Sequence, residues 1–339
     1  MPKKVTMESI ALKLGISKNT VSLALRGMPG ISEATRKNIL TEAESMGYKY
    51  KSSTRQQPVR NLCLVIAKST RDSIGFFSFI QVGIEDEAKK NNFNTIIHYY
   101  DESDEVFETP NCVRNGMVSG IITLGRITRK TINEIITYKL PVVMVDNYFD
   151  SLEMDCILTD NQCGGYLAAE YLIKAGHGNI GFLGDIHASV SFYDRYQGYL
   201  KALAAYGLKQ GQEYSVTAFP LERRKSEDMA LTIGKMRKAQ GLPTAFFCCN
   251  DAEALILMKV LQKMGISIPE EVSVVGFDDI ETSRSVTPAL TTMRVRKELM
   301  GRKAVCKLLK KIDSSEEIAE KILLSASIVE RQSVKILRR

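Results

Sequence analysis

Long apolar runs are absent from this chain of 339 residues. No run reaches the ~18–20 apolar residues that are needed to span a bilayer. The first ten residues, MPKKVTMESI, carry positive charge but lack the apolar segment of a secretory signal. Both absences argue against a membrane protein or an exported protein, and they predict a cytoplasmic location.

The cysteine pattern lacks the features of a metal site or of a disulfide framework. The seven cysteines are odd in number, scattered and largely within apolar runs, and no CxxC pair or histidine-containing zinc spacing occurs. We therefore expect reduced, buried thiols, and neither a metal nor a cofactor. The adjacent Cys248 and Cys249 fit redox sensing or, more simply, two strand residues.

Motifs of common enzyme classes are also missing. The chain has no GxSxG elbow, no GxGxxG after a strand, no P-loop and no HExxH. His177 has no nucleophile near it in the sequence, which favours a structural role in a loop. These absences predict a protein that is not an enzyme and has no catalytic residues. The lack of tryptophan leaves any stacking on a sugar ring to Phe or Tyr.

Positive charge, by contrast, is concentrated at one end of the chain. Residues 1–60 hold eleven Lys and Arg against four Glu, which is a net charge of +7. The net charge of the whole chain is also +7, so residues 61–339 are neutral. A basic segment joined to a neutral body is the electrostatic pattern of a protein that binds a polyanion at one end.

The basic segment contains two short predicted helices that are separated by a tight turn, within VTMESIALKLGISKNTVSLAL (5–25). Thr6 and Ser17 are predicted N-caps, and Gly15 allows the first helix to end. Apolar residues at helical spacing form the buried sides of the two helices: Ile10, Ala11, Leu14, Val21, Ala24 and Leu25.

Polar residues remain outside at the start of the second helix: Lys18, Asn19, Thr20 and Ser22. A helix-turn-helix places such a first turn in the major groove of DNA, where it reads base edges and phosphates. A plain helical hairpin gives the same pattern, and the local positive charge favours the DNA interpretation. A third predicted helix begins after Ser32 and ends near Gly47, and Ile39, Ala43 and Met46 close a small core.

Residues 5–48 resemble the headpiece of the lactose-repressor (LacI/GalR) family of bacterial transcription regulators. The matching stretches are IALKLGISKNTVSLAL and ISEATRKNILTEAESMGY, and further family signatures follow in order: GHGNIGFLG, residues 265–294 and IVERQS. The resemblance implies a homodimer that binds pseudo-palindromic operator DNA, and a sensor body that takes a small effector. The predicted DNA-binding residues are Thr6, Ser17, Lys18, Asn19, Thr20, Ser22, Arg26 and Arg36.

The linker departs from the family pattern. Family members usually carry a short hinge helix with a Leu that wedges into the minor groove and kinks the operator. Here the position holds Gln56, Gln57 and Pro58, and a proline ends a helix rather than continuing it. Leu23 also replaces an Arg that the family commonly places on the reading helix. Operator affinity, operator bending or the linkage of effector to DNA is therefore expected to differ in this protein.

From residue 62 the pattern changes to alternating strands and helices. The predicted strands are 62–67, 93–100, 120–125, 142–147, 179–184, 245–250 and 272–277. The predicted helices between these strands are 77–91, 162–175, 192–206 and 252–264. Such alternation predicts doubly wound parallel sheets, and its recurrence predicts two lobes. The expected fold class is an all-α helix-turn-helix headpiece followed by an α/β body, whose two lobes resemble periplasmic sugar-binding proteins.

The predicted boundaries divide the chain into three parts. Residues 1–48 form the headpiece, residues 49–61 the linker, and residues 62–339 the effector-binding and dimerisation domain. A helix near 297–311 is expected to return to the first lobe, so both lobes are discontinuous in sequence. The predicted segments are 62–160 and 292–323 for the first lobe, and 161–291 and 324–339 for the second.

Polar side chains follow several of the predicted strands, at the edge where ligands bind such sheets. Carboxylates, an amide and a guanidinium hydrogen-bond hydroxyl groups in pairs, which suits a sugar or a nucleoside. Helix N-capping is the alternative and is favoured for Asp251 and Asp279. The resemblance supports effector-binding roles at Asp278, Asn250 and Arg195. The predicted effector-binding residues are Phe76, Asp146, Asp160, Arg195, Phe219, Asn250 and Asp278.

Two of these residues, Phe76 and Phe219, match positions where the family stacks an aromatic ring on its ligand, and core packing is an equal alternative for Phe76. The leading functional prediction is a repressor that a small effector, expected to be a sugar, controls. The alternative is a solute-binding receptor without DNA regulation, against which the basic headpiece and the missing signal segment count. The sequence leaves open whether the effector is a sugar, a nucleoside, a phosphorylated sugar or a protein, and whether it releases DNA or promotes binding.

Overall fold

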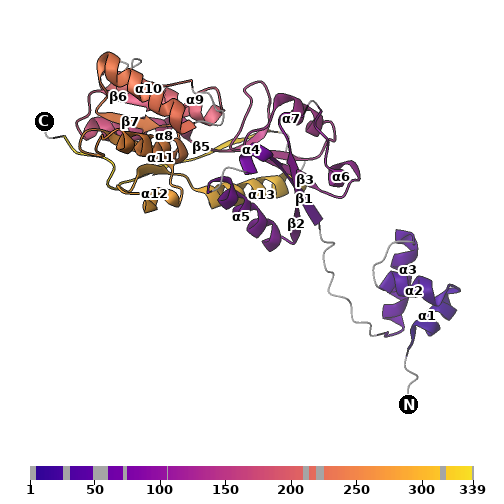
Figure 1. The fold of residues 1–339 in the computed structure, drawn as a ribbon. Coiled ribbons are helices and arrows are strands. Elements are labelled where there is room, and N and C mark those ends of the chain that lie inside the picture. Colours follow the sequence, from indigo (N-terminus) through magenta and orange to yellow (C-terminus); the bar gives the residue numbers. More distant parts are fainter. Residues whose placement is uncertain are drawn as a thin grey trace. The chain divides into compact units, whose positions relative to one another are not determined.

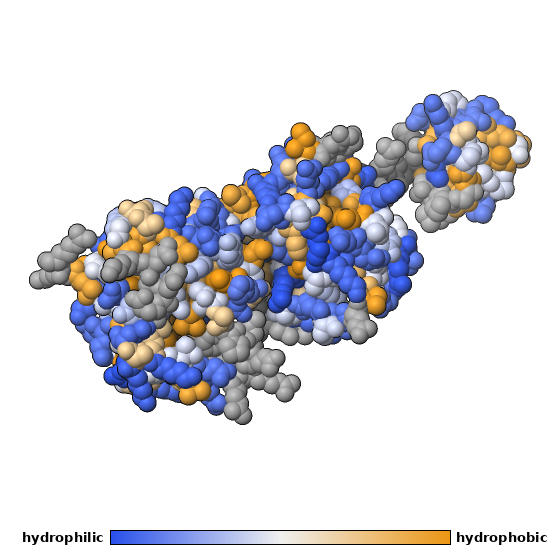
Figure 2. Space-filling model, turned by 90° about the horizontal axis from the view of Figure 1, so that it is seen from above, coloured by the Kyte–Doolittle hydropathy of each residue, from blue (hydrophilic) through white to orange (hydrophobic). Residues whose placement is uncertain are grey.

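The computed structural model describes most of the chain: residues 5–25, 31–48, 60–71, 75–104, 106–208, 214–218, 225–313 and 318–337. These residues form two compact units, 1–59 and 60–339. No helix of the described residues is long and apolar enough to cross a membrane. On the face seen in Figure 2, hydrophilic residues predominate and hydrophobic ones are scattered among them.

The first unit contains three helices, α1 (Met7–Leu14), α2 (Lys18–Leu25) and α3 (Glu33–Ser45). The Thr6 hydroxyl accepts a hydrogen bond from the backbone N–H of Ser9 and so caps α1. Gly15 ends α1 with a left-handed backbone, φ 66°, which glycine adopts without steric cost. The Ser17 and Ser32 hydroxyls accept from the N–H groups of residues 20 and 35 and thereby cap the next two helices. The predicted helix-turn-helix is confirmed.

The predicted core of this unit is also confirmed. Its buried residues come from all three helices: Ile10, Ala11, Val21, Ala24, Leu25, Ile39 and Ala43. Leu14 and Met46 are partly buried and pack against them. A core of this size is small, so the caps contribute a large share of the stability of such short helices.

Three predictions fall on parts of the chain outside the described residues. They concern Arg26, the ring of Phe219 and the linker residues 49–59, which include Gln56, Gln57 and Pro58.

The second unit contains two sheets, which Figure 1 shows with helices packed against them. The six-stranded sheet has the order β10-β5-β4-β3-β1-β2. Its strands are β1 (Arg60–Ala67), β2 (Phe93–Tyr100), β3 (Gly120–Leu124), β4 (Val142–Val145), β5 (Asp155–Thr159) and β10 (Lys321–Leu324). All of its pairings are parallel. We call this sheet and helices α4–α7 and α13 lobe 1.

The five-stranded sheet has the order β11-β9-β8-β7-β6 and is parallel except for the edge pair of β11 and β9. Its strands are β6 (Ile180–Leu183), β7 (Ala245–Cys248), β8 (Ser273–Asp278), β9 (Thr291–Arg294) and β11 (Ser327–Val329). We call this sheet and helices α8–α12 lobe 2.

The helices of lobe 1 are α4 (Lys68–Arg71), α5 (Phe77–Lys90), α6 (Asn111–Arg114), α7 (Arg129–Ile136) and α13 (Lys297–Asp313). Those of lobe 2 are α8 (Asn161–Lys174), α9 (Val190–Ala205), α10 (Lys225–Gln240), α11 (Asp251–Lys263) and α12 (Thr282–Ser285).

Each sheet is covered on both faces, because successive side chains of a strand point to opposite sides. On β1, Leu62 and Leu64 pack in the cluster that contains α5 and α13, whereas Cys63 and Val65 pack in the cluster that contains α6 and α7. The sheet of lobe 2 is divided in the same way between α8 with α9 and α10 with α11. This explains why the strands read as continuous apolar runs in the sequence.

The chain passes between the lobes three times, from β5 to α8, from β9 to α13 and from β10 to β11. The sequence predicted the return of a helix to lobe 1, which is α13. The predicted lobe 1 segment 292–323 begins within β9, but β9 pairs with β8 and therefore extends the sheet of lobe 2 through Arg294. Strand β5 and helix α10 were not recognised in the sequence.

Candidate DNA-binding and effector sites

The N-terminal turn of α2 presents the polar residues that the sequence predicted for DNA readout. Ser17, Lys18 and Asn19 are exposed, and Thr20 and Ser22 are half-buried. The Ser17 hydroxyl is 3.0 Å from the backbone nitrogen of Thr20, so it holds the first turn in helical geometry. Lys18 forms an ion pair with Glu8 of α1, and both side chains are solvent-exposed. An exposed pair of this kind is weak, so Lys18 is free to exchange Glu8 for a phosphate or a base.

Arg36 has a different position from the one expected of a phosphate contact. Its side chain is only 15% exposed and donates from Nη1 to the carbonyl oxygens of Leu23 and Ala24, at 3.4 Å each. These carbonyls lie at the C-terminal end of α2, where a cation is favourable for the helix dipole. The geometry favours a role for Arg36 in holding α2 in place. Thr6 likewise caps α1 with its hydroxyl.

In the second unit, three of the predicted effector residues meet where the lobes join. Asp146 follows β4 of lobe 1, Asp278 ends β8 of lobe 2, and Arg195 lies on α9 of lobe 2. Asp146 and Asp278 both have a positive backbone φ, 58° and 111°. Backbone strain of this kind persists only where the surrounding structure fixes it, and it recurs at ligand sites.

Arg195 is one of the most deeply buried charged residues, at 2% exposure. Its Nε donates to Oδ1 of Asn161 at 2.9 Å, and its Nη1 donates to the carbonyl oxygen of Cys249 at 2.6 Å. The guanidinium carbon lies 3.8 Å from the centre of the Phe277 ring, which is a cation–π contact. These contacts fix the guanidinium plane and leave Nη2 directed at Asp278, 3.2 Å from Oδ1.

Two glycines allow α8 and α9 to approach closely enough to bring Arg195 to this position. A Cβ atom on Gly165 of α8 would lie 2.2 Å from the carbonyl oxygen of Arg195. A Cβ atom on Gly198 of α9 would lie 2.0 Å from the carbonyl oxygen of Gln162. Neither backbone oxygen can move without shifting a helix, so both positions require glycine.

Asp278 keeps hydrogen-bonding capacity despite its burial. Its Oδ1 is buried and accepts no hydrogen bond from the described residues, although it is paired with Arg195. Burial raises the pKa of Asp278, and the positive charges of Arg195 and Lys297 offset this only in part. Each carboxylate oxygen has two lone pairs, so Asp278 can accept a further donor beside Arg195.

Asp146 connects this cluster to lobe 1. The Ser191 hydroxyl of α9 donates to Oδ1 of Asp146 at 3.3 Å. Burial raises the pKa of Asp146 to about 7, with Arg195 lowering it and Asp278 raising it further. A second bond between the lobes runs from the Tyr148 hydroxyl to Oδ1 of Asp194, at 3.2 Å. Ser191, Tyr148 and Asp194 were not predicted, since no sequence pattern distinguishes such contacts from surface polar residues.

Three further predicted effector residues lie among the described residues, and each has a structural role there. Phe76 is 6% exposed and packs edge-to-face on Phe77, with 4.9 Å between ring centres, which favours the core alternative. Oδ1 of Asn250 accepts from the backbone N–H of Glu253 and caps α11. Oδ1 of Asp160 caps α8 in the same way, and Asp160 is half-buried.

The N-cap expectation for Asp251 and Asp279 is wrong. Asp251 is the first residue of α11, after the N-cap Asn250, and accepts hydrogen bonds from the N–H of Ile280 and the hydroxyl of Thr292. Burial raises the pKa of Asp251 to about 8, and the charge of Asp278 adds to this rise. Asp251 therefore links α11, the helix that follows β7, to Thr292 of β9.

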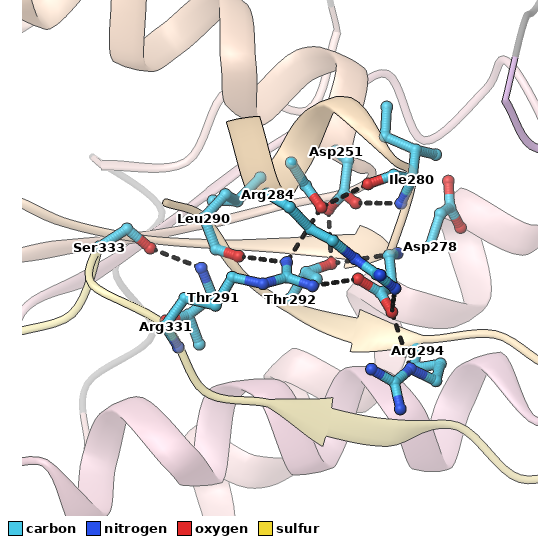
Figure 3. A network of polar contacts seen from close by, with 12 residues as sticks. Asp251, Asp278, Ile280, Arg284, Leu290, Thr291, Thr292, Arg294, Arg331 and Ser333 are labelled. Atoms are coloured by element: carbon cyan, nitrogen blue, oxygen red, sulfur yellow. Dashed lines mark hydrogen bonds and ion pairs between the residues drawn. The ribbon is translucent and has the colours of Figure 1, made fainter. Parts of the chain in front are cut away.

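Asp279 pairs with three arginines from separate segments, as the dashed lines in Figure 3 show around Arg284, Arg294 and Arg331. Burial alone would raise the pKa of Asp279, but hydrogen bonds from Arg331 and Arg294 outweigh burial and lower the pKa to about 2. Asp279 thus ties the end of β8 to β9 and to the C-terminal segment.

Two smaller predictions can be compared with the structure. His177 is buried, with Nδ1 3.0 Å from the Thr244 hydroxyl and Nε2 3.1 Å from the carbonyl oxygen of Lys335, so its structural role is confirmed. The expectation of buried cysteines is wrong for Cys163 and Cys306, which are exposed. Among the described residues, no group of three or more His, Cys, Asp or Glu side chains is arranged to hold a metal ion.

Comparison with known proteins gives matches over nearly the whole chain. Residues 6–50 match the model of bacterial regulatory proteins of the lacI family, and residues 169–334 match that of the periplasmic binding protein-like domain. A probable repressor of Bacillus subtilis, ExuR, is 31% identical, and the match covers 98% of this chain and 99% of the relative. The chain belongs to the lacI family.

Two further relatives support this assignment. The ribose operon repressor of Haemophilus influenzae is 29% identical, with 98% of this chain and 99% of the relative covered. A crystal structure of a LacI family regulator from Enterococcus faecium with bound ribose is 26% identical and has a TM-score of 0.69. That match covers 82% of this chain and 100% of the other. Both curated relatives are named as transcriptional repressors rather than as enzymes.

Proposed function

We propose that this lacI-family regulator is a repressor that binds operator DNA as a homodimer and responds to a carbohydrate effector. Residues 1–48 form the DNA-binding headpiece, residues 49–61 the linker, and residues 62–339 the effector-binding and dimerisation domain. The observation that carries the effector part is the buried Arg195–Asp278 pair beside Asp146, at the junction of the lobes. The receptor alternative lacks support, because the curated relatives are repressors by name.

The DNA-binding role rests on the first turn of α2. Lys18 and Asn19 are exposed at its N-terminus, and a helix N-terminus directs backbone N–H groups at an anion. Lys18, Asn19 and Thr20 are the base-reading side chains in this proposal, and Ser17, Ser22, Thr6 and Arg26 contact phosphates. Arg36 positions α2 instead.

The effector role rests on the chemistry of the junction. A sugar ring presents several hydroxyl groups, each of which both donates and accepts a hydrogen bond. Asp278 and Asp146 offer carboxylate acceptors, and the guanidinium of Arg195, which pairs with Asp278, offers donors. Asn250 and Asp160 border the site from the N-termini of α11 and α8. The ribose named for two of the relatives supports a sugar of this size.

Effector binding is coupled to the angle between the lobes. The Ser191–Asp146 and Tyr148–Asp194 hydrogen bonds both run from one lobe to the other. A sugar that inserts beside Asp146 competes with Ser191 for the same carboxylate. Only a ligand that binds the two lobe arrangements unequally shifts their populations, and this competition supplies such a difference.

The first experiment measures binding of the full chain to fluorescent duplex DNA from upstream of its own operon, over a range of salt concentrations. We expect log K to fall linearly with log salt, because phosphate contacts release counterions. Lys18→Ala should weaken specific binding by about 1–3 kcal/mol. Lys13→Ala is the matched control, since Lys13 is exposed and pairs with Glu42 on the same unit. Equal effects of the two substitutions would contradict the reading role of α2.

The second experiment screens sugars by thermal shift. A ligand at about one hundred times its Kd stabilises the folded state by about 2.7 kcal/mol, which raises the melting temperature by several degrees. Asp278→Asn should abolish the shift while DNA binding is retained, because the amide presents a donor where the carboxylate accepts. Asp104→Asn, at an exposed loop residue, is the control. A variant D278N that still responds to the sugar would place the effector elsewhere.

A further inference from the structure

A cavity lies on the part of the molecule where β9 continues into α13. Its volume is about 640 Å³, which is the size of a small-molecule site. Residues from both lobes line it, including Phe79 of α5, Arg284 of α12 and Arg302 of α13. Arg195, Asp278 and Asp146 do not line it, so the cavity is separate from the effector site proposed above.

Positive charge predominates in the lining of this cavity. Among the described residues, five cationic side chains line it: Arg284, Arg294, Arg296, Lys297 and Arg302. The acidic side chains in the lining are Asp279, Glu281 and Glu298. Asp279 already pairs with three arginines: Arg284 and Arg294 of the lining, and Arg331, which does not line the cavity. The single buried carboxylate therefore cannot neutralise the cations around it.

Two of the cations have little compensation from the protein. The Nε atom of Arg302 is buried and has no hydrogen-bond partner among the described residues. The nearest ion pair of Arg302 is with Glu298, at 3.9 Å, the far limit for such a contact. Arg296 is exposed on the same rim. The side chain of Arg302 is 44% exposed, so Arg296 and the exposed part of Arg302 are compensated mainly by water, and charge-assisted hydrogen bonds to an anion are stronger than those to a neutral acceptor.

Lys297 gives the cavity a fixed cationic wall. Its Nζ donates to the carbonyl oxygens of Asp278 and Asp279, at 2.5 and 3.0 Å. Nζ also lies 6.0 Å from the centre of the Phe79 ring, whose exposed face forms an apolar edge of the cavity. Burial lowers the pKa of Lys297, and the carboxylates Asp278, Asp279 and Asp251 oppose this. A further negative charge would stabilise the protonated amine.

We propose that this cavity binds a small metabolite with two or more phosphate charges, such as a diphosphate. Guanidinium groups recognise phosphate through paired N–H donors, and five cations against three carboxylates in the lining favour an anion with at least two charges. Arg284 comes from lobe 2, whereas Arg296 and Arg302 come from the β9–α13 connection and lobe 1. A bound diphosphate bridges the lobes and favours the arrangement in which these arginines are close.

The test is calorimetric titration of the full chain with sodium pyrophosphate in the absence of divalent metal, at constant ionic strength. We expect saturable binding of one pyrophosphate per chain and weaker binding of orthophosphate. Arg302→Gln and Arg296→Gln should each lower the affinity about tenfold, which corresponds to the loss of one charge-assisted hydrogen bond. Melting temperatures of the variants establish that they are folded.

Lys303→Gln is the matched control, because Lys303 is the exposed neighbour of Arg302 on α13 and does not line the cavity. It removes the same charge and should leave the affinity unchanged. A second arm repeats the titration with the headpiece saturated by duplex DNA, and we expect the pyrophosphate binding to persist. If the protein does not bind the duplex DNA, this result contradicts only the proposed DNA-binding function. The titration with pyrophosphate alone needs no DNA and still tests the cavity.

Three results would overturn the proposal. The first is the absence of saturable pyrophosphate binding. The second is an equal loss of affinity in the variants R302Q and K303Q, which would reduce the effect to overall charge. The third is displacement of pyrophosphate by DNA, which would make the cavity a nucleic-acid contact.

Discussion

Nη2 of Arg195 lies 3.2 Å from Oδ1 of Asp278, and the two residues are 2% and 8% exposed. An ion pair this deeply buried gives little net stability, because removing two charges from water offsets their attraction. The ion pair instead fixes the position of two charged groups: they come from α9 and β8 of lobe 2 and lie beside Asp146 of lobe 1.

Arg195→Lys should destabilise the protein more than a surface substitution does. A lysine keeps the charge but cannot donate to Asn161 and Cys249 at the same time as it pairs with Asp278. We expect a loss of about 3 kcal/mol in the free energy of unfolding of the second unit, as for other broken buried pairs. Urea unfolding measures this loss. Lys201→Arg on the exposed side of α9 is the control, and a loss of similar size there would refute the explanation.

The ionisation of Asp146 should make stability depend on pH. Its pKa is raised to about 7 in the folded protein, above its unfolded value, so the folded state holds the proton more tightly. The stabilisation is present at low pH and is lost as pH rises between the unfolded pKa and about 7. Asp146→Asn removes the titrating carboxyl group, so the stability of the variant does not fall over this pH range for this reason. The melting temperature of the variant relative to the parent should therefore increase from pH 5 to pH 8, roughly the span over which the group ionises.

The pH comparison has a direct control. Asp104→Asn, in an exposed loop, should leave the difference from the parent independent of pH. If the difference between the D146N variant and the parent stays constant over the same range, Asp146 is not the group that titrates.

Gly165→Ala should disturb the effector site by displacing α9, which carries Arg195. The added Cβ would lie 2.2 Å from the carbonyl oxygen of Arg195, so α9 must move away from α8 and carry Arg195 with it. We expect a destabilisation of about 1–3 kcal/mol and a loss of sugar response, as for an overpacked core. Gly234→Ala on α10 is the matched control, since its Cβ meets no atom within 4 Å. That substitution should stabilise α10 by up to about 1 kcal/mol.

Arg36→Gln should weaken the headpiece without changing its sequence preference. The guanidinium bonds two carbonyl groups at the C-terminal end of α2, and its loss leaves these groups and the helix dipole without a cation. We expect lower stability of residues 1–59 by about 1 kcal/mol and a uniform fall in affinity for all operators. A change in the salt slope by about one would instead identify a phosphate contact.

The sequence by itself determined the elements, because they depend on local patterns. Helix caps at Thr6, Ser17 and Ser32 and apolar spacing fixed the three helices of the headpiece. Continuous apolar runs fixed most strands of the body, since strands covered on both faces expose no polar side. The charge division between residues 1–60 and the remainder is likewise a property of composition. Asp278 and Arg195 were found because they belong to motifs of the family.

Only the tertiary structure decided which polar groups meet. Asp251 and Asp279 follow strands in the same way as Asp146 and Asp278, yet Asp251 bonds Thr292 of β9, and Asp279 pairs with three arginines, of which Arg331 lies in the C-terminal segment. In the sequence Arg36 cannot be distinguished from other cations on a helix, and only the packing of α2 against α3 shows that it bonds the carbonyl groups of Leu23 and Ala24. The cationic cavity joins residues of α5, α12 and α13, which are far apart in the chain. Such sets depend on the crossing of the chain between lobes, and no local pattern records which side chains that crossing brings together.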